Sequence, residues 1–167
     1  MSLYDIIVLR HIMATTKKQR AGWVAPEKLA ELAEFRYLLR EFLSFSEAAT
    51  EVVGISAQQY QLLQVIAAVP VGQERSISHV AERMLLRHNS AVELVDRAQR
   101  SGLVQRVVDE SDHRRSLLEI TERGQQLLSL LVEEHLKEIE AKGPEMGRTL
   151  QRLIGGRPRA LKRVEER

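Results

Sequence analysis

Hydrophobic residues recur at every third or fourth position along most of the chain, which indicates a mainly helical protein. The first long run begins at Pro26, a residue that suits the first turn of a helix, and ends at Gly54. Its apolar positions are Leu29, Leu32, Ala33, Leu39, Phe42, Leu43, Ala49, Val52 and Val53. One small domain has difficulty covering so long an apolar stripe, so this helix is expected to face a partner as well as its own core.

Three shorter helices are predicted next. Ser56, with Gln59 three residues later, forms a capping box that opens the first, and the turn residues 70–72 end it. The second begins near Ser78, its expected N-cap, and the third extends over about residues 89–100. The expected inward positions are Leu62, Leu63, Ile66 and Val69 in the first helix, Val80, Ala81, Met84 and Leu85 in the second, and Ala91, Leu94, Val95 and Ala98 in the third.

The periodicity then changes. Residues 103–108 and 116–120 are typical of two strands, and the charged segment between them predicts a hairpin with an extended tip. Thr121 is expected to cap a long fifth helix with apolar positions Leu127, Leu128, Leu131, Val132, Leu136 and Ile139. Gly143-Pro144 is expected to end that helix, so that a short sixth helix carries Met146, Leu150, Leu153 and Ile154.

Two short helices in tandem followed by a hairpin predict a mainly α fold with a small β-hairpin wing, namely a winged helix-turn-helix plus a helical dimerisation region. Residues 55–120 would form the winged helix-turn-helix, and residues 26–54 and 121–155 the dimerisation region. Residues 1–25 are interpreted as an N-terminal extension, of which residues 1–12 precede a second candidate start at Met13. Residues 156–167 are expected to form a flexible basic tail.

Composition narrows the class of protein. The 167 residues are 44% hydrophobic and 29% charged, as in a folded soluble domain, and the absence of cysteine excludes disulfides, thiolate nucleophiles and cysteine-zinc sites. The apolar run 6–9 is too short to cross a membrane and has no cleavage site after it, so a cytoplasmic protein without a membrane partner is expected. Net charge is only +2, but residues 75–115 contain eight basic and six acidic side chains, whereas residues 31–74 contain two and six. Binding to a polyanion would therefore depend on clustered charge.

The helix over residues 89–100 is the candidate for contact with double-stranded DNA. With its apolar side packed inward, the helix presents Asn89, Ser90, Glu93, Arg97 and Arg100 outward, and Arg87 and His88 lie just before its first turn. The N-terminal end of such a helix meets base edges, where arginine suits guanine and asparagine suits adenine. An ordinary solvated helix face is the alternative, and the helix order with the hairpin favours DNA.

The hairpin tip is the second candidate DNA contact. Arg114 and Arg115 would reach phosphates or a narrow minor groove, and Asp112 would pair with an arginine and fix the shape of the tip. Arg75, Arg83 and Arg106 are expected to neutralise further phosphates. A charged turn without a partner is the alternative for the tip.

The run MLLRHNSAVELVDR over residues 84–97, with Gly102-Leu103-Val104-Gln105-Arg106, resembles the recognition helix and first wing strand of the MarR family of transcriptional regulators. The run DHRR at 112–115 is similar to that family's wing motif, and LEITERG at 118–124 to the segment after the wing. The resemblance covers about residues 27–155 and implies a homodimeric DNA-binding regulator, most commonly a repressor, acting on a near-palindromic operator. Arg87, Asn89 and Ser90 replace the serine or proline and threonine that often open the family's recognition helix, so the operator sequence cannot be carried over.

Other kinds of site find little support. The five histidines lack metal-ligand spacing, and no nucleophile elbow or phosphate loop occurs, so neither enzymatic activity nor a metal or cofactor is expected. The family resemblance implies a small aromatic or anionic effector between the dimer region and the winged helix. The candidate effector residues are Tyr37, Arg40, Phe42, Tyr60 and Met84, for each of which core packing is the more frequent role. Two alternatives stay open: a winged-helix module that binds protein without an operator, and a ligand-binding helical dimer without a regulatory role.

Overall fold

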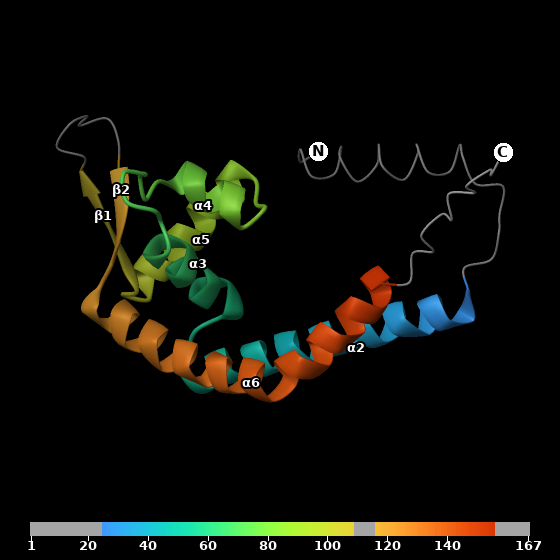
Figure 1. Ribbon diagram of the computed structural model, residues 1–167. Helices are drawn as coiled ribbons and strands as arrows, with labels where there is room; N and C mark the ends of the chain where they lie inside the picture. The colour runs from blue at the N-terminus through green and yellow to red at the C-terminus, as the bar shows by residue number, and fades with distance from the viewer. Residues whose placement is uncertain (1–24, 109–115, 156–167) are drawn as a thin grey trace, which may run out of the picture.

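The computed structural model describes residues 25–108 and 116–155, and it confirms the mainly helical fold with a two-stranded hairpin (Figure 1). In chain order the elements are α2 (Pro26–Val52), α3 (Ala57–Ala67), α4 (Ile77–Arg83), α5 (His88–Arg100), β1 (Val104–Val108), β2 (Ser116–Ile120) and α6 (Glu122–Gly155). The predicted extension, hairpin tip and basic tail lie outside the described residues. None of the described helices is both long and apolar enough to cross a lipid bilayer.

Helices α3, α4 and α5 pack with the hairpin around one apolar core. The strands are antiparallel, with Val104 opposite Ile120 and Val108 opposite Ser116. The N–H of Leu118 also donates to the carbonyl of Arg75 at 2.8 Å, so the segment before α4 adds a single further bond to the sheet. The buried side chains include Leu62, Leu63, Ile66, Val80, Ala91, Leu94, Val95, Ala98, Leu103 and Leu118.

The beginning of α4 differs from the prediction. Its N-cap is Ser76, whose hydroxyl accepts from the backbone N–H of His79 at 3.2 Å, and Ser78 lies inside the first turn. Because Arg75 is held to β2, the chain can turn into the helix directly after it. The capping box at Ser56 and Gln59 is present as predicted, with both reciprocal bonds formed.

The expected break at Gly143-Pro144 is also wrong, because α6 continues through both residues. Proline inside a helix removes one backbone donor and crowds the carbonyl four residues earlier, so the helix continues only where other contacts hold the segments on both sides. Helix α2 provides these contacts: Lys142 lies 3.6 Å from Glu41 before the proline, and Lys28 donates to the carbonyl of Arg152 after it. No separate sixth helix therefore forms.

Helices α2 and α6 run side by side and extend away from the winged helix as a two-helix arm (Figure 1). Buried His135 of α6 marks the junction between this arm and α3. One ring nitrogen, Nδ1, bonds the carbonyl of Leu131 at 2.7 Å, and Nε2 lies 2.9 Å from the hydroxyl of Ser46 on α2. The rings of Phe45 and Tyr60 pack against the imidazole at centroid distances of 5.3 and 4.6 Å. The junction is thus a packed polar and aromatic cluster.

Candidate nucleic-acid interface

Helix α5 presents two opposite faces. Ala91, Leu94, Val95 and Ala98 are at most 1% exposed and fix its inner side against the core. The outward residues expected from the sequence are all solvent-exposed: Arg87, His88, Asn89, Ser90, Glu93 and Arg97. All six side chains are therefore accessible to solvent, which a DNA contact requires.

The N-terminus of α5 is open to an anion. Arg87 is its N-cap, with an extended backbone and no side-chain hydrogen bond to the first turn. That turn has no acidic residue, so the partial positive charge of the helix end is not offset there. Backbone N–H groups and two basic side chains, Arg87 and His88, thus occupy the same end of the helix.

Arg106 has an intramolecular role that sequence reasoning missed. Its guanidinium donates to Asp96 at 2.6 Å and to Gln99 at 2.7 Å, so it connects β1 to α5. Both members of the ion pair are partly exposed, and such a pair contributes roughly 0–1 kcal/mol to stability. Its main effect is geometric, because it sets the direction of the wing relative to the helix.

Arg75 and Arg97 are less constrained than Arg106. Arg75 is exposed, and the bond to β2 uses only its backbone carbonyl. Arg97 donates to the neutral amide of Gln58 over a long 3.4 Å, and it forms no ion pair with any residue in the described ranges 25–108 and 116–155. Asp112, Arg114 and Arg115 lie outside the described residues, and β1 and β2 lead toward them.

Leu85 corrects the sequence prediction. It was expected inside α4, but it follows the end of that helix and is 63% exposed. Its φ of 56° lies in the left-handed region. Met84, Leu85 and Leu86 are three consecutive apolar residues, and a helix cannot bury all three on one face. This run was the only sign in the sequence that one of them would be exposed.

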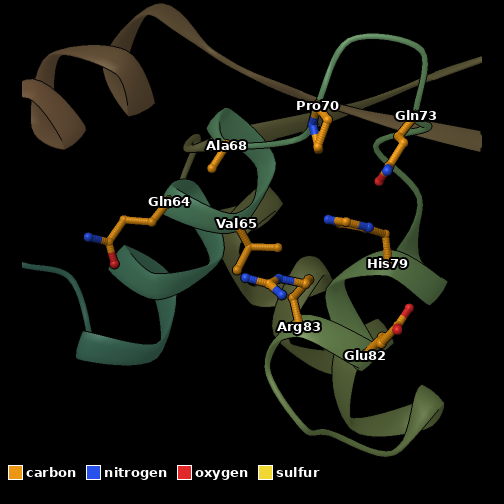
Figure 2. Close-up of a pocket in the computed structure, with 8 residues that line it drawn as sticks. All are labelled: Gln64, Val65, Ala68, Pro70, Gln73, His79, Glu82 and Arg83. Carbon is orange, nitrogen blue, oxygen red and sulfur yellow. The ribbon is translucent and has the colours of Figure 1, made fainter.

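A hollow of about 520 Å³ separates α3 from α4 (Figure 2). Its lining residues are Gln64, Val65, Ala68, Pro70, Gln73, His79, Glu82 and Arg83. Figure 2 shows the ring of His79 extending from α4 toward the segment that carries Pro70 and Gln73. None of the outward residues of α5 contributes to it, so this hollow is separate from the candidate DNA surface.

The five candidate effector residues do not converge on one cavity. Tyr37 and Arg40 line a hollow of about 510 Å³ between α2 and α6, where the Tyr37 hydroxyl donates to Glu41 at 2.8 Å. That hydrogen bond raises the pKa of Tyr37 above its ordinary value. Phe42 and Tyr60 instead pack against His135 in the interior. Met84 packs beside the winged-helix core.

Comparison with known proteins identifies the winged-helix segment. Residues 53–115 match a family model described as MarR family. This segment is similar to the MarR family. The resemblance predicted from the sequence is therefore confirmed over these residues, which include α3, α4, α5 and β1. No curated protein matches the chain.

Solved MarR-family structures extend the likeness beyond that segment. AbsC from Streptomyces coelicolor, a MarR family transcriptional regulator, is 17% identical with a TM-score of 0.66, over 80% of this chain and 93% of that one. S. aureus MepR in a DNA complex is 19% identical, with a TM-score of 0.56, over 72% of this chain and 95% of that one. CouR from Rhodococcus jostii RHA1, solved with p-coumaroyl-CoA, is 24% identical, with a TM-score of 0.56 over 70% and 85%. At these identities the chain shares the fold of MarR-family transcription regulators, arm included.

Proposed function

We propose that this protein is a non-enzymatic transcription regulator that binds double-stranded DNA as a homodimer, through α5 and the wing. The main support is the exposed N-terminal end of α5, where no side chain caps the backbone N–H groups of the first turn. Four exposed polar side chains lie at this end: Arg87, His88, Asn89 and Ser90. A helix end of this kind binds phosphate and brings short polar side chains to base edges.

The proposed contacts fall into two groups. The side chains from Arg87 to Ser90, with Glu93, approach base edges in the major groove, where Glu93 accepts from cytosine. Arg75, Arg97, Arg114 and Arg115 neutralise phosphates, and this part is independent of sequence. Arg106 and Asp112 position the wing; for Arg106 the bond to Asp96 supports this assignment.

The two-helix arm supports the homodimer. Its exposed large hydrophobic residues, each at least 37% exposed, are Leu29, Leu32, Tyr37, Leu39, Leu43, Val52, Leu130, Leu136, Ile139, Leu150 and Ile154. So much apolar surface along two adjacent helices is typical of an interface, here one of roughly 2,000 Å². We assign residues 26–54 and 121–155 to dimerisation and residues 55–120 to DNA binding.

Two-fold symmetry determines the form of the DNA site. Two α5 helices that enter major grooves one turn apart, about 34–36 Å, require a near-palindromic operator. A dimer bound there excludes other proteins from the same DNA, so repression is the proposed outcome. The structure of CouR with p-coumaroyl-CoA supports a small effector as the releasing signal. Such an effector must bind the DNA-incompetent arrangement more tightly.

Selection from a randomised duplex library, followed by fluorescence anisotropy of the enriched duplex at several salt concentrations, tests this function. Arg114→Ala and Arg115→Ala should weaken binding to all duplexes, and each should reduce the salt slope by about 1.8, because each removes one phosphate contact from both protomers. Asn89→Ala should instead change preference at particular bases. Arg36→Ala, an equal charge change at an exposed position on α2, is the matched control and should bind like wild type.

Absence of any enriched, salt-sensitive duplex would contradict the function and favour a module that binds protein. DNA binding by a monomer would contradict the symmetric arrangement alone. Effector release is tested by adding small aromatic acids and acyl-CoA thioesters to the bound duplex, and it fails if none lowers the anisotropy.

A further inference from the structure

Leu85 occupies a backbone position that glycine fills elsewhere in this chain. The N–H of Leu85 donates to the backbone carbonyl of Glu82 at 3.2 Å, and the N–H of Leu86 donates to the backbone carbonyl of Ala81 at 2.9 Å. Helix α4 therefore ends in a Schellman motif with Leu85 in the left-handed conformation. Helices α2 and α5 end with the same pair of bonds, and there Gly54 and Gly102 have φ values of 75° and 67°. Among the described residues Leu85 alone adopts positive φ without being glycine.

This leucine is unfavourable for the free protein in two respects. A side chain with a Cβ strains the left-handed backbone, which glycine adopts without penalty. The side chain is also 63% exposed, while Met84 and Leu86 on either side pack against the core. Glycine would remove both costs and leave the core unchanged. Strain retained at an exposed position indicates a functional contact.

The position of Leu85 indicates what that contact is. It lies two residues before Arg87, the N-cap of α5, and therefore next to the side chains proposed to reach base edges. Leucine has no hydrogen-bonding group, and the one apolar group on a base edge in the major groove is the C5-methyl of thymine. We propose that Leu85 is a specificity-determining residue that contacts a thymine methyl in each operator half-site. This inference rests on the proposed DNA-binding function.

The test combines one change in the protein with one change in the DNA. The duplex enriched by the wild-type chain is resynthesised with deoxyuridine in place of each thymine in turn, which removes the methyl and leaves base pairing intact. At one position in each half-site, wild type should bind about fourfold more weakly, the factor that corresponds to ~0.8 kcal/mol for one methyl group. Leu85→Gly should bind thymine and uracil duplexes equally, both about 15-fold more weakly than wild type binds the thymine duplex, because the variant lacks the contact in both half-sites.

Two controls separate this contact from a loss of folding. Leu85→Gly should unfold at the same temperature as wild type or a higher one, because φ of 56° suits glycine. Val71→Ala alters another exposed apolar residue, in the turn between α3 and α4, and should retain the wild-type difference between thymine and uracil.

The outcomes distinguish the inference from the function on which it rests. Binding by wild type with no position sensitive to uracil, or equal sensitivity in Leu85→Gly, overturns the role of Leu85 and leaves the DNA-binding function in place. Failure of the wild-type chain to enrich any duplex overturns both. A uracil effect present in wild type and absent only in Leu85→Gly supports the contact.

Discussion

The winged helix buries its apolar residues within one chain, whereas the two-helix arm leaves many of its apolar residues exposed. All four buried residues of α5 are apolar, and its polar residues face solvent. Helix α2 is twice as long, yet it buries only Leu38, Ser46 and Thr50, of which two are polar. The winged helix therefore completes its core within one chain, whereas the arm keeps much of its apolar surface exposed, and the proposed homodimer would cover this surface. Stability of the first should be intrinsic, and stability of the second should depend on assembly.

Gly124→Ala should give the largest effect, because it disrupts the attachment between the two regions. A Cβ there would overlap the carbonyl oxygen of Leu103 and lie 2.7 Å from Cγ2 of Ile120. The unfolding free energy should fall by about 3 kcal/mol, measured by urea denaturation. Gly147→Ala on the same helix has nothing within 4 Å and should raise it by about 0.5–1 kcal/mol. Equal effects from the two variants would contradict the close contact at Gly124.

Truncation of a leucine in each region tests the comparison directly. Leu63→Ala creates a cavity in the closed core, where the side chain is 0% exposed, and should cost about 2.5 kcal/mol. Leu43→Ala in the arm, at 50% exposure, should cost less than about 1 kcal/mol in chains kept monomeric by dilution. Denaturation at low protein concentration measures both. An equal loss in the two variants would show that the arm has a complete core of its own.

Charges on the arm should prevent assembly. Leu136 and Ile139 lie one turn apart on α6 and are 52% and 48% exposed. The double substitution Leu136→Glu/Ile139→Glu should raise the dimer dissociation constant at least about 100-fold, equivalent to ~2.7 kcal/mol, measured by sedimentation equilibrium. Gln126→Glu adds an acidic side chain at an exposed polar position of the same helix and should leave assembly unchanged. A double variant that dimerises like wild type would place the interface elsewhere.

Tyr60→Phe at the junction should give the smallest effect. The Tyr60 hydroxyl is buried without a hydrogen-bond partner among the described residues, and burial raises the pKa of this phenol. Removing an unsatisfied hydroxyl while keeping the ring against His135 should stabilise the protein by up to about 1 kcal/mol, or roughly 2–4 °C in Tm. Destabilisation instead would indicate that the hydroxyl gains a partner in the assembled protein.

The sequence predicts those features of the fold that depend on neighbours along the chain. The capping box at Ser56 and the inner face of α5 follow from spacings of three and four residues, and both are present. The start of α4 at Ser76 and the continuity of α6 through Pro144 depend instead on the contacts of distant segments with β2 and α2. No local pattern reveals such contacts, and local rules therefore failed at these two places.

The same distinction applies to the candidate site. Exposure of Asn89 and Ser90 follows from helical periodicity alone. The ion pair between Arg106 and Asp96 joins a strand to a helix, and no local pattern predicts it. From the sequence alone, Arg106 is therefore expected to be an unpaired surface cation. The left-handed backbone at Leu85 is a property of how α4 ends, and a leucine gives no sign of it in the sequence.

Helix α6 begins beside the wing and continues without interruption to the far end of the arm. At the start of α6, the Thr121 hydroxyl donates to the backbone carbonyls of Gly102 and Leu103 at 2.7 and 3.1 Å. Thirty-four residues at 1.5 Å each give a helix about 50 Å long along its axis. In the proposed dimer, a change in the angle at which two such helices cross would move both wings at once. The distance between the two proposed DNA-binding surfaces would therefore be set from the opposite end of the molecule.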